Sequence, residues 1–131
     1  MVKLSDLKAG QDPRTVEKFN SLESVMHEPV LLVLEELERL GWLPIIIEGR
    51  RTLAQQQEKV NKGYSKTMKS KHLLGLAVDI VDRRYLWGGP AAKQSFPFWN
   101  NLGAAGKRQG FIWGGDWKSF PDVAHLQYKN Y

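Results

Sequence analysis

The sequence predicts an α+β fold in which helices flank a small antiparallel or mixed sheet. Apolar residues recur at helical spacing over residues 30–40, whereas β-branched residues form two short runs, at 43–48 and 75–81. The helical and extended patterns do not alternate strictly, so the repeated βαβ units of a parallel sheet are not expected. The chain of 131 residues has the size of one domain that buries its own core, and we expect a single domain over residues 1–131.

The first half of the chain contains three expected helices and one strand. A short helix is expected over residues 15–22. A second, over residues 29–41, begins near a proline, carries an apolar face opposite its glutamates and ends at a glycine. An isoleucine-rich strand follows at 43–48, and a Thr-x-x-Gln capping box opens a helix over residues 52–61.

The second half begins with a polar, basic stretch and then a strand at 75–81. Residues 82–95 form a loop rich in glycine and proline, and a helix is expected over residues 97–109. A short extended segment at 111–113, a Gly-Gly turn and a final strand at 125–128 complete the chain. These elements are enough to place the chemical motifs.

Composition excludes several classes of site. The chain has no cysteine, which rules out disulfide scaffolds and cysteine-ligated zinc or iron–sulfur sites. Any metal must be held by His, Asp or Glu, and the three histidines are His27, His72 and His125. The net charge of +5, from 19 basic and 14 acidic residues, favours a polyanionic partner without choosing among nucleic acid, membrane and cell wall. The dispersed acidic residues make a poor nucleic-acid footprint, so no nucleic-acid partner is expected.

No segment is expected to insert stably into a membrane. The longest apolar runs are far shorter than the roughly 20 residues needed to cross a bilayer. The first residues lack the apolar region of a signal peptide, so we expect none.

Two histidines and one aspartate lie in unusual sequence settings. Asp79 stands inside an apolar strand, where a carboxylate is costly unless it is paired or bound to a metal. His72 precedes the turn that leads into this strand, and His125 lies on the last strand, three residues after Asp122. Two histidines and an aspartate, with water in the fourth position, make the ligand set of a catalytic zinc site.

Two further residues suit catalysis at such a site. Asp122 is a carboxylate close to the third ligand and is a candidate to accept a proton from water. Arg51, at the end of the other buried strand, is a candidate to stabilise an oxyanion. The spacing alone leaves open that His72 and His125 are ordinary hydrogen-bonded histidines, which is the expectation for His27.

The motifs that carry these residues resemble those of a family of zinc peptidases, over about residues 20–128. The family includes D-Ala-D-Ala carboxypeptidases and dipeptidases and phage L-alanyl-D-glutamate endopeptidases. Four segments occur in the family's order: Gly49-Arg50-Arg51-Thr52 followed by Gln57, Ser70-x-His72-x-x-Gly75-x-Ala77-x-Asp79, Gly114-Gly115-Asp116-Trp117 preceded by Trp113, and Asp122-x-x-His125.

The resemblance implies a fold and a set of roles. It implies the zinc fold shared by D-Ala-D-Ala peptidases and Hedgehog-type signalling domains, with one Zn²⁺ per chain held by His72, Asp79 and His125. Asp122 becomes the catalytic acid/base and Arg51 the group that binds the substrate carbonyl or its tetrahedral intermediate.

The resemblance also suggests substrate contacts, at Ser70, Gln57, Trp113 and Trp117. One departure concerns the last ligand. Many relatives carry a proline directly before it, whereas Ala124 stands here and lacks the fixed φ of proline.

The function implied is hydrolysis of the L-Ala–D-Glu bond of bacterial peptidoglycan stem peptides by a phage or prophage endolysin. A D-Ala-D-Ala carboxypeptidase or dipeptidase of the same family is the nearest alternative. A non-catalytic, zinc-containing cell-wall-binding module is an alternative from another class, against which the presence of Asp122 beside His125 argues.

The implied partner is the stem peptide, and the protein is expected to be a monomer. It would be made in the host bacterial cytoplasm and would act on the wall after release, with a holin as the indirect route. The lysines between Lys59 and Lys71 are interpreted as a solvated loop that could also attract anionic wall polymer.

Overall fold

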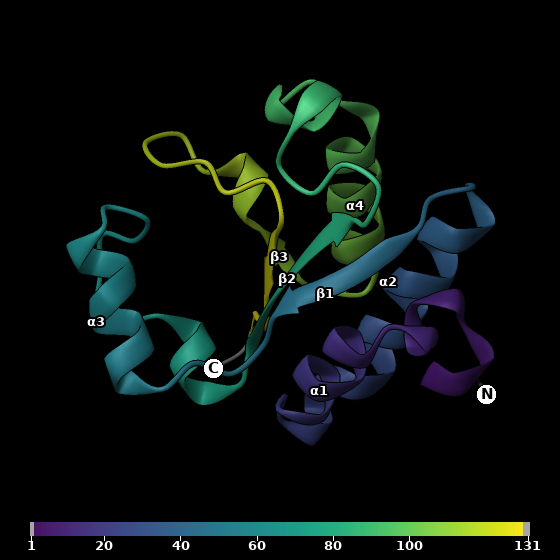
Figure 1. Cartoon of the computed structure of the whole chain (residues 1–131), viewed down its shortest axis with the longest axis horizontal. Helices are drawn as coiled ribbons and strands as arrows, with labels where there is room; N and C mark the ends of the chain where they lie inside the picture. Colours follow the sequence, from purple (N-terminus) through teal and green to yellow (C-terminus); the bar gives the residue numbers. More distant parts are fainter. Residues whose placement is uncertain (1, 130–131) are drawn as a thin grey trace.

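A computed structural model describes residues 2–129 as helices on a four-stranded sheet (Figure 1). Its four α-helices are α1 (Pro13–Asn20), α2 (His27–Arg39), α3 (Leu53–Asn61) and α4 (Pro97–Arg108). Its strands are β1 (Pro44–Glu48), β2 (Ala77–Asp82), β3 (Ile112–Trp113) and β4 (His125–Gln127). The predicted α+β class is confirmed.

The sheet is antiparallel throughout, with strand order β1-β2-β4-β3. The two long strands, β1 at the edge and β2 beside it, pair with Ile46 opposite Ile80. The short last strand β4 lies between β2 and β3 and brings His125 opposite Asp79. The C-terminal strand therefore carries residues from the far end of the chain to the centre of the sheet.

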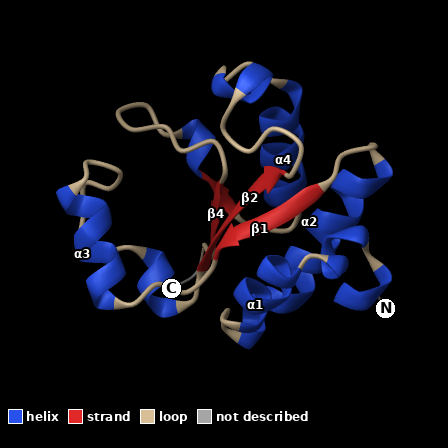
Figure 2. Ribbon diagram, in the orientation of Figure 1, coloured by secondary structure: helices blue, strands red, loops and turns tan. Residues whose placement is uncertain are grey.

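The core lies between the sheet and the helices α1, α2 and α4. The apolar face predicted for the second helix is confirmed, because Val30, Val33, Leu34 and Leu37 of α2 are fully buried. Helix α2 packs against α4, and α1 packs against β1. In contrast, α3 lies away from the other α-helices, beyond the C-terminal end of β1 (Figure 2). It buries one residue, Gln56.

Several boundaries differ by one or two residues from those predicted; α2, for example, spans His27–Arg39 where residues 29–41 were expected. Two of the differences have a clear local cause. Helix α1 starts earlier because the Asp12 side chain accepts a hydrogen bond from the Arg14 amide and Pro13 takes the first helical position. The second strand starts later, at Ala77, because a short 3₁₀ helix ends at Gly75, which has a left-handed φ of 70°. The loop at 82–95 contains a 3₁₀ turn at Gly89–Ala92.

The capping box predicted for the third helix is present. The Thr52 hydroxyl accepts from the Gln55 amide, and the Gln55 side chain accepts from the Thr52 amide. Within residues 2–129, no helix has the length and apolar character that a membrane span requires.

Candidate metal and active site

The structure brings His72, Asp79 and His125 together as a buried cluster. His72 lies on the 3₁₀ helix Lys71–Leu74, Asp79 lies on β2, and His125 begins β4 as the cross-strand partner of Asp79. Asp79 Oδ1 lies 3.2 Å from His72 Nε2 and 3.1 Å from His125 Nδ1. One potential ligand atom from each residue lies within 4.8 Å of the others.

The outward-facing nitrogens of both histidine rings are held by oxygen acceptors. His72 Nδ1 donates to the Gly49 carbonyl at 2.7 Å, and His125 Nε2 lies 2.9 Å from the Gln127 side-chain oxygen. A proton on each outer nitrogen leaves the inner nitrogen of a neutral ring with a free lone pair. Such outer contacts orient the histidines of metal sites.

The electrostatics of the cluster favour an ionised carboxylate. Burial opposes ionisation of Asp79, but the charges and hydrogen bonds of His72 and His125 outweigh it and lower the Asp79 pKa. Burial likewise disfavours a charged His125, yet its bond to Asp79 raises its pKa above the ordinary value.

This donor set fits a zinc ion. Two imidazole nitrogens and one carboxylate oxygen are ligands that zinc prefers, and three protein ligands leave a coordination position open. The low pKa of Asp79 keeps that carboxylate ionised, as a metal ligand must be. A divalent cation would take the place of the hydrogen bonds that join His72 and His125 to Asp79.

Asp122 lies at the edge of the cluster, 3.8 Å from His125 Nδ1 through its Oδ2. Burial raises its pKa to about 6, and the nearby charge of Asp79 adds to the rise. A carboxyl group with a pKa in this range both accepts and returns a proton near neutral pH. Asp122 therefore lies beside the cluster, and its role as the catalytic acid/base stays a prediction.

Hydrogen bonds to neighbouring segments hold the residues from Asp122 to Ala124 in place. The amide of Asp122 donates to the Gly114 carbonyl at 2.9 Å, and the indole of Trp113 donates to the Val123 carbonyl at 2.7 Å. Ala124 is buried, and its carbonyl accepts from the Ile80 amide at 3.0 Å. These three bonds supply rigidity at the position where many relatives carry proline.

Arg51 lies on the other side of the cluster with its side chain buried among acceptors. Its Nη2 lies 3.6 Å from Asp79 Oδ2, and its Nη1 donates to Gln56 Oε1 at 2.9 Å. Its Nε lies 3.5 Å from Glu48 Oε1 and makes no hydrogen bond within residues 2–129. The guanidinium is thus held in place and retains donor capacity beside the cluster.

The structure does not bring Gln57, the predicted substrate contact, to the cluster, whereas its neighbour Gln56 bonds Arg51. Gln57 is exposed, and its side chain bonds Asn61 on its own helix, away from Arg51. Gln56 is fully buried; it accepts from Arg51 and donates to Ser65 Oγ and the Thr67 carbonyl. Neighbouring residues on a helix point about 100° apart, so a shift of one position moves the side chain off the site.

The tryptophans and Ser70 take different positions. Trp117 packs beside the His125 ring at 5.1 Å between centroids and lines the adjacent cavity with Ser70. The Ser70 hydroxyl also accepts from the His72 amide. Trp113 instead packs against Gly103 of α4, where an added Cβ would approach its ring to 2.4 Å, and it lines neither cavity beside the cluster. Trp113 therefore packs between α4 and the segment that carries Asp122, and does not face the cavities.

Two other residues considered from the sequence lie outside the cluster. His27 stacks on Phe19, and its Nε2 bonds the Phe19 carbonyl, so it is structural as expected. Asp116, a possible alternative base, is paired with Lys107 at 2.9 Å and is largely exposed.

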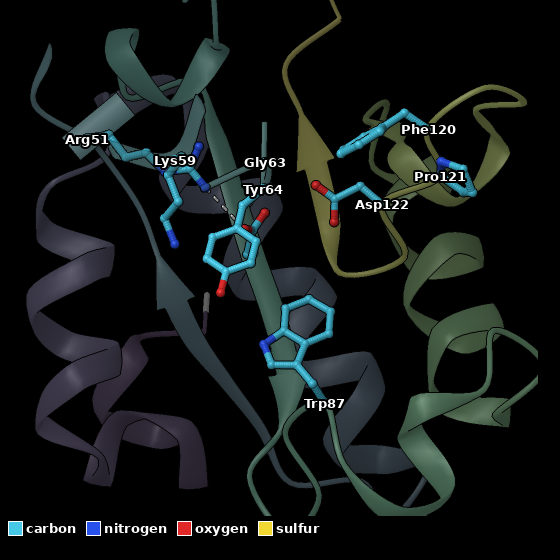
Figure 3. Close-up of a pocket in the computed structure, with 9 residues that line it drawn as sticks. Arg51, Lys59, Gly63, Tyr64, Trp87, Phe120, Pro121 and Asp122 are labelled. Carbon is cyan, nitrogen blue, oxygen red and sulfur yellow. Dashed lines mark ion pairs between the residues drawn. The ribbon is translucent and has the colours of Figure 1, made fainter. Parts of the chain in front are cut away.

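The site opens into a cleft with two connected cavities. One, of about 510 Å³, is lined by Arg51, Asp79 and Asp122 together with Tyr64 and Trp87 (Figure 3). The other, of about 300 Å³, shares Arg51, Tyr64 and Asp122 with the first. Asp79 lines the first cavity, and His72 and His125 line the second, so all three residues of the cluster border the cleft.

A buried His₂Asp cluster with an adjacent carboxylate and arginine, on this sheet, has the form of a metallopeptidase site. Residues 63–128, just over half of the chain, match the profile of a peptidase family described as D-alanyl-D-alanine carboxypeptidase. The chain belongs to this family, which is part of the M15 peptidases. The family description does not by itself fix the bond cleaved.

Curated relatives are similar over much of the chain. The L-alanyl-D-glutamate peptidase of Listeria phage A118 is 37% identical over 123 residues, which cover 90% of this chain and 42% of that protein. The peptidoglycan L-alanyl-D-glutamate endopeptidase CwlK of Bacillus subtilis is 32% identical over 101 residues, covering 63% of this chain and 59% of that protein. The chain thus spans about half the length of these relatives.

Solved structures confirm the predicted fold. The crystal structure of the Serratia marcescens L-Ala D-Glu endopeptidase ChiX superposes with a TM-score of 0.66 and 28% identity, covering 89% of this chain and 87% of that one. The structure of a vancomycin-resistance D,D-pentapeptidase VanY variant in complex with Zn(II) has a TM-score of 0.60 and 23% identity, covering 82% and 72% of the two chains. The second likeness concerns the fold alone.

Proposed function

We propose that this protein is a zinc-dependent peptidase that hydrolyses the L-Ala–D-Glu bond of peptidoglycan stem peptides. The observation that carries the proposal is the buried His72–Asp79–His125 cluster with Asp122 at its edge. The choice of bond rests on the names of the phage A118, CwlK and ChiX relatives. One zinc ion per chain would be held by His72, Asp79 and His125.

Each residue of the site has a role in the proposed reaction. A zinc ion, when bound, acts as a Lewis acid on the scissile carbonyl and makes water more acidic. Asp122 accepts the proton of the attacking water and then delivers a proton to the leaving D-Glu amine. Arg51, fixed by Gln56 and Asp79, donates to the oxygen that becomes negative as the carbonyl carbon turns tetrahedral.

Ser70 and Trp117 line the cleft beside His125 and contact the bound peptide in this proposal. Gln56 and Trp113 act through other residues. Gln56 positions Arg51, and Trp113 positions the segment that carries Asp122.

The experiment that tests the proposal is digestion of purified muropeptides followed by mass spectrometry. Cleavage as proposed leaves a new carboxylate on L-Ala and a new amine on D-Glu. Release of free D-Ala as the one product would make the protein a carboxypeptidase. Tight binding with no product, in zinc-loaded protein, would identify a non-catalytic wall-binding module.

The phage A118 relative supports a biological role as a phage or prophage endolysin. In this role the protein is made in the host bacterial cytoplasm, acts as a monomer and reaches the wall after a holin opens the membrane. Lysis by expression with a holin, and no lysis by expression alone, is the expected result. Size-exclusion chromatography with light scattering tests the monomer.

A further inference from the structure

Two exposed aromatic side chains line the cavity beside Asp122. Trp87 is 47% exposed and Tyr64 is 67% exposed, and both line the cavity that contains Arg51 and Asp79. Figure 3 shows the Trp87 indole at the lower end of this cavity, beneath the Tyr64 ring. Aromatic surface in contact with water gains free energy when a ligand covers it. We call the part of the cavity lined by Trp87 and Tyr64 the aromatic end.

The turn that precedes Trp87 has a strained backbone. Leu86 has a φ of 53°, the one positive value of a non-glycine residue within residues 2–129. Its amide donates to the Asp82 carbonyl at 2.9 Å, which holds this strained turn at the end of β2. Trp87 stacks on the buried Trp99 at 5.5 Å between ring centroids. Strained backbone is typical of functional positions. In this turn, one face of the Trp87 indole packs on the core, and other parts of the indole line the cavity.

Tyr64 is also placed by a specific turn. Helix α3 is followed by Gly63, with a φ of 78°, and the Tyr64 amide then donates to the Lys59 carbonyl at 2.9 Å. The charge of Lys59 at this end is matched by Glu48, at 3.2 Å. The aromatic end thus consists of the Trp87 and Tyr64 rings and of Lys59, whose charge is paired with Glu48.

The second cavity has a lysine-rich part, which we call the cationic end. The second cavity is lined by Lys66, Lys69 and Lys71 together with His72 and His125. Lys66 lies over the Phe120 ring at 4.8 Å, and neither Lys66 nor Lys69 forms an ion pair with a carboxylate of residues 2–129. Trp87 lines the first cavity alone and these lysines line the second alone, whereas Tyr64 lines both.

The proposed substrate has a matching asymmetry. In peptidoglycan the L-Ala amine is acylated by the lactyl group of N-acetylmuramic acid, so a neutral sugar ring lies one residue before the scissile bond. The D-Glu on the other side is linked through its side chain and carries a free α-carboxylate. The C–H face of a pyranose packs on an aromatic ring and buries apolar surface there.

We propose that Trp87 and Tyr64 form a subsite for the N-acetylated sugar that precedes L-Ala, with the D-Glu side of the peptide at the cationic end. The inference rests on the proposed function and adds a substrate class to it: a glycan-attached stem peptide is preferred over a free one. Sugar contact at this subsite contributes about 10- to 100-fold to kcat/KM, as expected from covering one aromatic side chain.

The test compares two synthetic substrates with zinc-loaded protein. One is N-acetylmuramoyl-L-Ala-γ-D-Glu-L-Lys, and the other is the same peptide with an acetyl group in place of the muramoyl group. Trp87→Ala should remove the preference for the muramoyl substrate and leave hydrolysis of the acetyl peptide within about twofold. Tyr64→Ala, a surface change that leaves the core intact, should reduce the preference in the same direction, and Trp87→Phe should retain most of it.

Leu53→Ala is the control, since Leu53 is an exposed apolar residue that lines neither cavity. It should keep the preference. Equal losses on both substrates in Trp87→Ala and Tyr64→Ala, or no preference in the unmodified protein, would overturn the subsite. If neither substrate is cleaved, the proposed function fails, and tryptophan fluorescence titration with the muramoyl peptide then tests the subsite separately. Saturable quenching that is lost in Trp87→Phe and Tyr64→Ala supports the subsite. The absence of saturable quenching overturns it.

Discussion

Asp79 and His125 face each other across the β2–β4 ladder, with Asp79 Oδ1 3.1 Å from His125 Nδ1. They are 46 residues apart in the sequence, and the antiparallel register makes them direct neighbours. His72 completes the group from the turn that precedes β2. The geometry of the candidate metal site is therefore a consequence of sheet register.

Removal of metal should abolish peptidase activity, and added zinc should restore it. The reason is that His72, Asp79 and His125 supply three ligands and leave a position open for chemistry. Elemental analysis of the purified protein should give one zinc per chain, and His72→Ala should lose it. Full activity in protein shown to be metal-free would contradict the assignment.

Asp122→Asn should separate catalysis from metal binding. The amide keeps the shape of the side chain but cannot accept the proton of water, so the rate should fall by about 10²- to 10⁴-fold while zinc content is unchanged. Zinc stoichiometry and initial rate are measured on the same preparation. Loss of zinc as complete as in His72→Ala would make Asp122 a ligand, and an unchanged rate would place the base elsewhere.

Gln56→Ala and Gln57→Ala form a matched pair of adjacent substitutions. Gln56 holds Arg51 and the Ser65–Thr67 segment through three buried hydrogen bonds, so its loss should lower stability by about 1–3 kcal/mol and reduce activity. Gln57 bonds Asn61 on the helix surface, and its loss should change stability by less than about 0.5 kcal/mol. Urea unfolding and kcat/KM measure both effects. The reverse order of the two variants would restore Gln57 as the functional residue.

Gly114→Ala should displace the segment that carries Asp122. A Cβ at this position would lie 2.4 Å from the Asp122 carbonyl oxygen and 3.0 Å from its Cβ, so the segment must shift, at a cost of about 1–3 kcal/mol. Activity should fall together with stability. Gly88→Ala is the control, because its nearest neighbour would be an ordinary contact at 3.6 Å. Equal activity of the two variants would show that the Gly114 contact does not position Asp122.

Asp82 should contribute to stability only above acidic pH. Burial disfavours its charge, but hydrogen bonds from Arg84 and the Leu43 amide outweigh burial and hold its pKa below 3.8. A lowered folded pKa gives stabilisation that is present above about pH 4 and is lost as the pH falls through the folded value. In metal-free protein, Asp82→Asn should therefore be less stable than the unmodified chain at pH 7, by about 1–3 kcal/mol, and the difference should shrink below pH 3.8.

Chemical denaturation at pH 7 and pH 3 measures this difference. Asp6→Asn, a change at an exposed position, serves as the control and should alter stability by less than about 0.5 kcal/mol at either pH. A difference between Asp82→Asn and the unmodified chain that is the same at both pH values would show that the charge of Asp82 does not contribute.

Local patterns were sufficient to predict most of the elements. The apolar face of α2, the isoleucines of β1 and the capping box at Thr52 depend on neighbours within a few residues, so periodicity and residue type identify them. The start of β2 was predicted two residues early because Gly75 and Leu76 fit an apolar strand pattern. The left-handed φ of Gly75 instead closes the turn that presents His72.

Residue composition and motif order were enough to name the candidate metal ligands. With no cysteine and three histidines, the set His72, Asp79 and His125 followed from composition and from the family motifs. Which other side chains lie beside this set could be seen from the folded chain alone. The tertiary structure selected Gln56 over Gln57 and placed Trp113 behind the site and Trp117 beside it. Convergence depends on helix phase, strand register and long-range packing, which set side-chain direction over distances that a local pattern does not encode.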